Sequence, residues 1–332
     1  MSIKKINLPW VEKYRPKKLE DLKSQTDILN TINKSINNRN FPHLLLYGPP
    51  GSGKTTCALA ICLKLYGKKM MNSRILELNA SDERGIKIVR DKIKTYASLA
   101  LSIPPKGYKY PCPKFKIIIL DEADAMTTDS QFALRRIIEK YSDSTRFILT
   151  CNYISKIISP ILSRCIGFKF RAIDETNGLN ILDRIIKEEN VKINKESIKE
   201  IYKLCSGDMR LSINLLQKLT YCEEKITSEI VRENYGIIPY KLINKILEKL
   251  KSDNSSEIII NLAKILMNRG FSSKLIIESF TLYFKNFKVL DDNKLCLFFN
   301  KISDIDHFLN LSGNQFISTV SILNYLAILV KN

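Results

Sequence analysis

The fold of this chain is decided by one stretch, Gly48-Pro49-Pro50-Gly51-Ser52-Gly53-Lys54-Thr55. It follows the apolar run 44–47 and precedes residues 55–65, whose apolar spacing predicts a helix. In such a strand, loop and helix, the loop N–H groups and the positive end of the helix dipole face a bound anion. Lys54 is expected to reach the β- and γ-phosphates, and Thr55 to ligate Mg²⁺. A chance glycine loop is the alternative, but this position predicts a site for the phosphates of ATP or GTP.

A second motif supplies carboxylates. The apolar run 117–120 leads directly into Asp121 and Glu122, which predicts a strand buried on both faces with acids at its carboxyl end. Ligands bind at that end of the strands in open α/β sheets. Asp121 is expected to hold Mg²⁺ and Glu122 to orient the attacking water as a base. A solvated acidic turn is the alternative, but the two half-sites together predict an ATPase.

The length and net charge of the chain limit its number of domains and the class of partner that we expect. The 332 residues are enough for two or three domains, each with its own core. Lys and Arg number 53 against 34 Asp and Glu, a formal net charge of +19 that favours a polyanionic partner. The chain is also rich in Lys, Ile and Asn, so compositional drift supplies part of this excess. Charge alone therefore does not assign nucleic acid binding.

The spacing of the eight cysteines and two histidines indicates which metal and disulfide sites can be expected. No CxxC pair occurs and the histidines stand alone, so neither a zinc cluster nor a disulfide framework is expected, and a reducing interior is implied. We find no charged-then-apolar leader and no apolar run near the roughly 18 residues that span a bilayer. We therefore expect a soluble, intracellular protein.

The coarse secondary structure predicts an α/β core followed by helices. Apolar runs alternate with helical patterns and predict a parallel sheet with flanking helices, its strands at 44–47, 75–78, 117–120, 147–151 and 168–170. Helical spacing then continues at 177–189, 195–206, 209–222 and 228–234. We divide the chain into a nucleotide-binding core at 1–171 and helical domains at 172–236 and 237–332. Turns are expected at 251–256 and 291–293.

One proline-rich and basic segment, 102–113, is expected to be a surface loop. Two interpretations of it stay open, an ordinary connection and a contact with DNA or a partner.

Four further motifs narrow the family. They are Val11-Glu12-Lys13-Tyr14-Arg15-Pro16, the run 79–86, Ser163-Arg164-Cys165 and Gly207-Asp208-Met209-Arg210. With the phosphate loop they resemble the small subunits of replication factor C, the AAA+ loader of the sliding clamp, over about residues 8–240. The run 111–116 looks most like a eukaryotic small subunit. The resemblance implies a P-loop AAA+ core, a helical lid, and a helical collar that joins subunits in a hetero-pentamer. The collar rests on position alone.

The resemblance also implies a nucleotide pocket for ATP and Mg²⁺. Asn152 would act as a sensor that holds the attacking water or the γ-phosphate, and Arg210 would contact the γ-phosphate from the lid. For these two, a buried amide and a capping arginine are the alternatives, and Leu211 and Ser212 leave any second basic contact unmet. Mg²⁺ would be held by Thr55 and Asp121. The predicted nucleotide-binding residues are Val11, Tyr14, Arg15, Pro16, Gly48, Pro49, Pro50, Gly51, Ser52, Gly53, Lys54, Thr55, Thr56, Asn152 and Arg210.

A trans arginine follows from the same resemblance. Arg164 would complete the ATP site of a neighbouring subunit as an arginine finger, an effect of about 10³ to 10⁵ in rate in other phosphoryl-transfer systems. Arg135 and Arg136 are candidates for a second trans contact, with an ordinary solvated helix face as the alternative. The predicted catalytic residues are Lys54, Glu122, Asn152 and Arg164.

Partners follow as well. Primer-template DNA would be held through its phosphates, independent of sequence and with steep salt dependence. The predicted DNA contacts are Arg84, Arg90 and Lys156. Apolar residues within 86–101 would dock a PCNA-like sliding clamp, with core packing as the alternative. The resemblance places the protein in the nucleus, although a large DNA virus could encode a similar chain.

Two rival functions stay open. An AAA+ DNA motor of the branch-migration or helicase type shares the phosphate loop and a trans arginine, but would act as a homohexamer. A scaffold subunit would bind ATP without hydrolysing it. The intact Lys54, Asp121, Glu122 and Asn152 argue against the scaffold.

Overall fold

The computed structural model describes residues 8–22, 25–37, 41–81, 89–223, 225–253, 255–311 and 313–331. Its contacts group into two compact units, residues 1–190 with 205–217 and residues 191–204 with 218–332. Among the described residues, none of the helices combines the length and apolar character that crossing a bilayer requires.

The first unit is built on a sheet of five parallel strands within the described residues. These are β1 (Leu44–Tyr47), β2 (Ile75–Asn79), β3 (Lys116–Asp121), β4 (Thr145–Cys151) and β5 (Ile166–Lys169). Their order is β2-β3-β4-β1-β5, so β1 lies between two strands that follow it by about 100 residues. Tyr47 pairs with Cys151, which places the carboxyl ends of β1 and β4 side by side. The predicted parallel sheet is confirmed.

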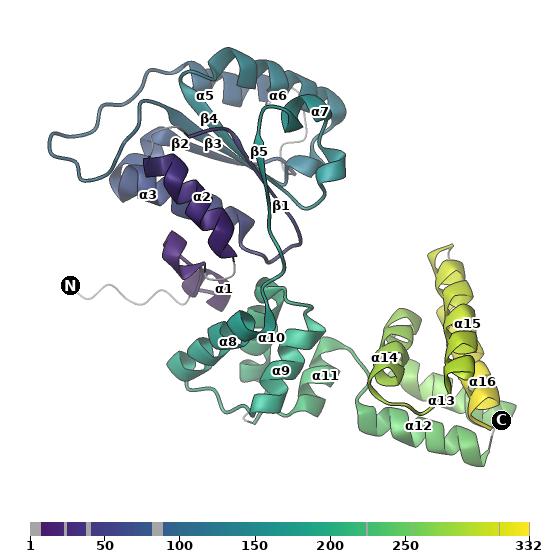
Figure 1. The fold of residues 1–332 in the computed structure, drawn as a ribbon. Coiled ribbons are helices and arrows are strands. Elements are labelled where there is room, and N and C mark those ends of the chain that lie inside the picture. The colour runs from purple at the N-terminus through teal and green to yellow at the C-terminus, as the bar shows by residue number, and fades with distance from the viewer. Residues whose placement is uncertain are drawn as a thin grey trace. The chain divides into compact units, whose positions relative to one another are not determined.

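Helices cover both faces of this sheet (Figure 1). On one side lie α2 (Thr26–Asn37) and α3 (Lys54–Arg74), and on the other α5 (Lys94–Ser98), α6 (Thr128–Tyr141) and α7 (Ser159–Leu162). Strand β3 shows the consequence, because Ile117 and Ile119 pack in one core and Ile118 and Leu120 in the other. Successive side chains point to opposite faces, so a strand covered on both sides must be apolar throughout.

Further helices and single turns belong to the first unit. They are α1 (Trp10–Lys13), η1 (Leu19–Asp21), η3 (Val89–Ile93), η4 (Ala123–Ala125), η5 (Ile154–Lys156), α8 (Glu175–Glu189) and the first part of α10 (Met209–Cys222). Helix α8 begins where Asp174 accepts a hydrogen bond from the N–H of Asn177, and it ends at Asn190 in the left-handed conformation. Both are usual helix boundary signals.

The second unit is helical in its described residues, apart from an isolated bridge between Ile193 and Ile226. Its helices are α9 (Lys195–Leu204), α11 (Ser228–Tyr235), α12 (Tyr240–Ser252), α13 (Ser256–Asn268), α14 (Ser273–Asn286), α15 (Asp292–Asn310) and α16 (Gln315–Lys331). Helix α16 contacts α12, α13, α14 and α15, and its Ile322, Leu323 and Leu326 are buried. One apolar core therefore unites the helices from α12 onward.

Two predicted boundaries are wrong. The last strand runs over Ile166–Lys169 instead of 168–170, because it pairs with β1 from Ile166 onward. The turn expected at 291–293 is the start of α15, since Asp291 caps that helix by accepting a hydrogen bond from the N–H of Lys294 at 2.8 Å.

The segment 102–113 contains no helix or strand, which confirms the predicted loop. The loop packs on α3: the hydroxyl of Tyr108 donates to the carbonyl of Tyr66 at 2.8 Å. The ring of Tyr110 lies over Gly67, where an added Cβ would be 2.5 Å from its Cε2 atom. These contacts tie the loop to its own core.

Candidate active site

The phosphate loop joins β1 to α3 and depends on its glycines. Gly48, Gly51 and Gly53 have φ angles of 144°, 66° and 92°, which side chains rarely adopt. A Cβ on Gly48 would lie 2.2 Å from the carbonyl oxygen of Phe170, and one on Gly51 would lie 1.9 Å from Oδ1 of Asp208. The loop is thus closely packed against Phe170 and Asp208, and the N–H of Gly48 donates to the carbonyl oxygen of Cys151 at 3.3 Å.

Lys54 is a buried cation at the start of α3. Its Nζ donates to the carbonyl oxygens of Gly48 at 2.9 Å and Pro49 at 2.8 Å. It also donates to Oδ1 of Asn152 at 2.8 Å, which joins the ends of β1 and β4. Burial lowers the pKa of Lys54, while attraction to Asp121 opposes that shift. These three oxygens hold the ammonium at the carboxyl ends of β1 and β4.

Asp121 accepts three hydrogen bonds at the end of β3. Its Oδ2 atom accepts from Oγ1 of Thr55 at 2.9 Å. Its Oδ1 atom accepts from Oγ1 of Thr150 and, at 3.1 Å, from the N–H of Glu122. The structure therefore brings together the two predicted Mg²⁺ ligands. Sequence analysis missed Thr150, a buried hydroxyl on β4 that directly follows the apolar residues Phe147, Ile148 and Leu149.

Glu122 has a left-handed backbone, with φ of 54° and ψ of 42°. Such a conformation costs a residue with a side chain roughly 1–2 kcal/mol and persists where surrounding contacts impose it, often at functional sites. Here its N–H donates to Oγ1 of Thr150 at 3.3 Å as well as to Asp121. The side chain is exposed, as a group that orients a water molecule must be.

Asn152 is positioned by a carboxylate that sequence analysis left without a role. Oδ2 of Asp124 accepts from the N–H of Asn152 at 3.2 Å and from the N–H of Tyr153 at 3.1 Å. This fixes the chain where it leaves β4, with the side-chain oxygen of Asn152 directed at Lys54.

The N-terminal segment contacts α8 through Tyr14 and Lys13. Tyr14 is buried, and its hydroxyl donates to Oε1 of Glu189 at 2.5 Å, while Lys13 forms an ion pair with the same carboxylate. Burial, followed by the bond to Glu189, raises the pKa of Tyr14 to about 12, so its hydroxyl is neutral at pH 7. Nε of Arg15 donates to Oγ1 of Thr56 at 3.3 Å.

A cavity of about 660 Å³ connects these groups, a size within the range of ligand pockets. Its lining includes the predicted residues Val11, Tyr14, Arg15, Pro16, Pro50, Gly51, Gly53, Lys54, Thr55, Thr56, Asp121, Glu122, Asn152 and Arg210. Gly48, Pro49 and Ser52 belong to the loop but not to this lining. Asn177, Arg184 and Glu188 of α8 also line the cavity and were not predicted. The cavity has both apolar and polar walls, and it contains the ammonium of Lys54 and the oxygen atoms of Thr55 and Asp121. These groups fit a magnesium nucleotide.

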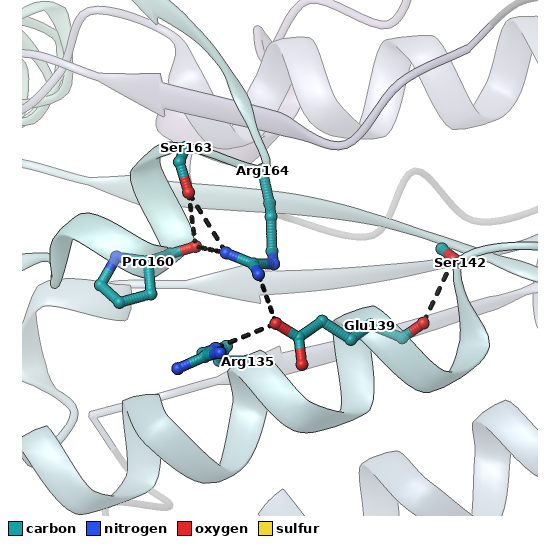
Figure 2. Close-up of polar contacts among 6 residues, drawn as sticks. All are labelled: Arg135, Glu139, Ser142, Pro160, Ser163 and Arg164. Carbon is teal, nitrogen blue, oxygen red and sulfur yellow. Dashed lines mark hydrogen bonds and ion pairs between the residues drawn. The ribbon is translucent and has the colours of Figure 1, made fainter.

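Arg164 is not among the residues that line this cavity. Figure 2 shows it extending from the segment after α7 towards α6. Its Nη1 donates to the carbonyl oxygen of Pro160 at 2.7 Å and to Oγ of Ser163 at 3.2 Å, and its Nη2 forms an ion pair with Glu139. The same carboxylate oxygen accepts from Nε of Arg135 at 2.9 Å. Sequence analysis missed Glu139, although its i,i+4 spacing from Arg135 was a signal.

The predicted DNA contacts are only partly described. Arg84 lies outside the described residues, and of Arg90 only the backbone, in η3, is described. Lys156 is exposed, and its ammonium lies 5.2 Å from the ring centroid of the exposed Tyr153.

The segment 86–101, which was predicted to dock a clamp, contains both buried and exposed residues in its described part. Ile93 and Ala97 are buried in the core, while Leu99 is 57% exposed. Core packing therefore accounts for the first two, and residues 86–88 lie outside the described part.

Three protein families match successive parts of the chain. They are the ATPase family associated with various cellular activities (AAA) at residues 44–171, a middle domain at 174–233 and the replication factor C C-terminal domain at 238–323. Replication factor C subunit 2 of Saccharomyces cerevisiae is 43% identical over 95% of this chain and 91% of the relative. This chain belongs to the replication factor C family. Subunit 5 of Homo sapiens is 41% identical, over 96% of this chain and 91% of the relative.

Membership in replication factor C makes the chain an AAA+ ATPase that binds nucleotide and assembles with other replication factor C subunits in a clamp loader. It is a small subunit of the eukaryotic type. The Holliday junction branch migration motor RuvB of Thermotoga maritima has a TM-score of 0.51 and 19% identity, covering 71% of this chain and 79% of the motor. At that identity it shows the fold alone.

Proposed function

We propose that this replication factor C subunit binds and hydrolyses ATP so that its complex loads a ring-shaped sliding clamp onto primer-template junctions. One observation carries the proposal. Most of the residues predicted to bind and activate a nucleotide line one cavity, whereas Arg164 lies outside its lining. A finger arginine that lies outside the cavity of its own chain fits a subunit that completes the ATP site of a neighbour.

The chemistry assigned to the cavity is phosphoryl transfer to water. Mg²⁺, held by Thr55 and Asp121, would neutralise charge on the phosphates. Lys54 and the loop N–H groups bind the β- and γ-phosphates, and Lys54 is already oriented by its bonds to Gly48, Pro49 and Asn152. Glu122 orients the water and accepts its proton, and Asn152 holds the γ-phosphate from the side of β4.

The adenine is assigned to the pocket walled by Val11, Tyr14, Arg15 and Pro16. Burial of Tyr14 and its bond to Glu189 support this, since a fixed ring offers a rigid wall to a planar base. Arg210 lines the same cavity from α10 and would contact the γ-phosphate there.

We further propose the division into an AAA+ core at 1–171, a lid at 172–236 and a collar at 237–332. The boundaries of the matched family segments support it. Primer-template DNA, a PCNA-like clamp and a nuclear location are proposed for this chain because it is a eukaryotic type of replication factor C subunit. The net charge of +19 supports a DNA partner.

The experiment is a measurement of native mass and subunit composition on the complex that a tagged copy of this chain captures. A five-membered assembly with four different AAA+ partners, and clamp loading that requires ATP, is the expected result. A homohexamer that moves branched DNA would overturn the proposal and favour the motor.

Glu122→Gln within the assembled complex separates hydrolysis from binding. ATP binding by this chain should persist while turnover at its own site falls. An unchanged turnover of the complex would assign this chain the scaffold role.

A further inference from the structure

Three charged side chains form a cluster where α6 meets the segment after α7 (Figure 2). Oε1 of Glu139 accepts from Nε of Arg135 at 2.9 Å and pairs with Nη2 of Arg164. The side chains are 33–39% exposed, so solvent reaches all three. Glu139 thus joins an arginine of its own helix to one from a different element.

The guanidinium of Arg164 is held through Nη1 and Nη2 and uses only part of its capacity to donate hydrogen bonds. Nη1 is held by the carbonyl of Pro160 and the hydroxyl of Ser163, and Nη2 by Glu139. Arginine has five N–H donors, and two adjacent ones bind an anion in a bidentate manner. Within the described part of the chain, the Nε–H group has no partner, and the Glu139 contact needs only one of the two hydrogens on Nη2. The group is therefore oriented and still able to bind a phosphate.

We infer that Glu139 is a positioning residue for Arg164, holding its guanidinium where a neighbouring subunit's triphosphate can meet it. This inference rests on the proposed function, in which Arg164 acts in trans. Two guanidinium groups without a shared carboxylate repel each other, so loss of Glu139 would move Arg164 away from Arg135.

The net charge of the cluster and its exposure to solvent indicate that Glu139 positions Arg164 and does not hold it back from a phosphate. Two arginines and one glutamate leave a net charge of +1, so the cluster attracts a triphosphate. The bond from Arg135 holds the pKa of Glu139 below its ordinary value, which keeps the carboxylate ionised at neutral pH. Exposed ion pairs are weak and exchange readily. The contact with Glu139 can orient Arg164 without preventing its transfer to phosphate.

The test measures ATP turnover in the reconstituted complex in which only the site facing Arg164 keeps its catalytic glutamate. Five variants of this chain are compared: Glu139→Gln, Glu139→Asp, Arg164→Ala, the double variant Glu139→Gln with Arg164→Ala, and the control Asp129→Asn. Asp129 lies on the first turn of α6, so the control removes a carboxylate from the same helix away from both arginines.

We expect Arg164→Ala to lower kcat by about 10³-fold or more. Glu139→Gln should lower kcat by about 10-fold, less than the 10²-fold that a 1 Å misplacement can cost, with KM within about twofold of the unmodified complex. The double variant should match Arg164→Ala, because Glu139 acts through Arg164. Glu139→Asp, which keeps the charge on a shorter side chain, should give an intermediate rate.

Each contrary outcome is distinct. Normal turnover with Arg164→Ala would reject the trans arginine, and the inference with it. If that variant is slow but Glu139→Gln equals the control or is faster, positioning is overturned and the proposed function stands. A further loss in the double variant, or failure of the Glu139→Gln complex to reach its native mass, would assign Glu139 to another role.

Discussion

Thr150→Val should weaken the metal-dependent step without changing the shape of the strand. The hydroxyl is buried on β4, donates to Oδ1 of Asp121 and accepts from the N–H of Glu122 at 3.3 Å. Valine has the same branching but can do neither. Asp121 would keep its bonds to Thr55 and to the N–H of Glu122, so its carboxylate remains in place but less firmly oriented.

The magnitude follows from these lost contacts. A hydrogen bond to a charged group contributes about 1.5–3 kcal/mol, and removing a group that orients a metal ligand typically costs about 10- to 100-fold in metal affinity or activity. We expect the Mg²⁺ concentration for half-maximal ATP turnover to rise by about 10-fold or more. The free energy of unfolding should fall by about 1–3 kcal/mol.

The same strand offers a matched control. Thr145 on β4 is also fully buried, but its Oγ1 has no hydrogen-bond partner in the described part of the chain. Thr145→Val should leave the Mg²⁺ dependence unchanged and keep or raise the free energy of unfolding by about 1 kcal/mol, because an unsatisfied buried hydroxyl is removed.

The assay is a Mg²⁺ titration of ATP turnover in the reconstituted complex, with thermal unfolding of both variants. Equal Mg²⁺ dependence in the two variants would refute the role of Thr150. A loss of stability in Thr145→Val as large as that in Thr150→Val would show that shape, and not hydrogen bonding, decides the outcome.

Three further predictions concern other residues. Arg164→Ala should leave nucleotide binding by this chain unchanged in equilibrium titrations while turnover at the adjacent site falls; weaker binding in this chain would contradict the trans assignment. A triple neutralising variant alters the predicted DNA contacts Arg84, Arg90 and Lys156. Its slope of log K against log salt should be shallower by up to about 2.7, because each phosphate contact contributes about 0.9, and an unchanged slope would remove these residues from the interface. His43 accepts from the N–H of Phe147 through Nδ1 at 3.1 Å, and burial, with the charge of Arg146 second, lowers its pKa to about 4. As the pH falls, His43 takes up a proton in the unfolded chain before it does so in the folded chain. The contribution of neutral His43 to the free energy of unfolding is therefore present above pH 6.5 and falls by about 3 kcal/mol in all towards pH 4. His43→Asn keeps an acceptor and should show a shallower loss of stability by thermal unfolding between pH 6.5 and 4; an equal loss would argue against His43.

Sequence alone predicted the sheet because its strands are apolar on both faces. Ile117 to Leu120 form such a run, and the structure buries all of it. The predicted start of the edge strand β5 was wrong because Ile166 pairs with β1 although this residue is 50% exposed. Apolar patterning detects burial and not hydrogen bonding, so an exposed edge residue carries little signal.

The start of α15 shows a second limit. Asp291, Asp292 and Asn293 were expected to form a turn because these residue types favour turns. The same short polar side chains cap helices, and acids in a first turn are stabilised by the helix dipole. Only the bond from the N–H of Lys294 to Asp291 separates the two outcomes, and composition does not specify it.

At the site, sequence predicted most of the groups that line the cavity but not those that hold them. Lys54 and Asp121 belong to spaced motifs with a known chemical logic. Thr150 and Glu139 act through contacts between elements distant in the chain, with Asp121 and Arg164 respectively. Such contacts depend on strand order and helix packing, which a linear pattern does not encode.

The strand order also has a consequence for biosynthesis. β1 pairs with β4 and β5, so its partners leave the ribosome about 100 residues after it. At a synthesis rate of about 5–20 residues per second, Leu44 to Leu46 of β1 remain without their partner strands for roughly 5–20 s. Until then the phosphate loop has no sheet to hold it, and the nascent chain presents an apolar strand with unpaired edges. We therefore expect newly made chains to engage a chaperone during this interval and to acquire nucleotide affinity only after β5 has been synthesised.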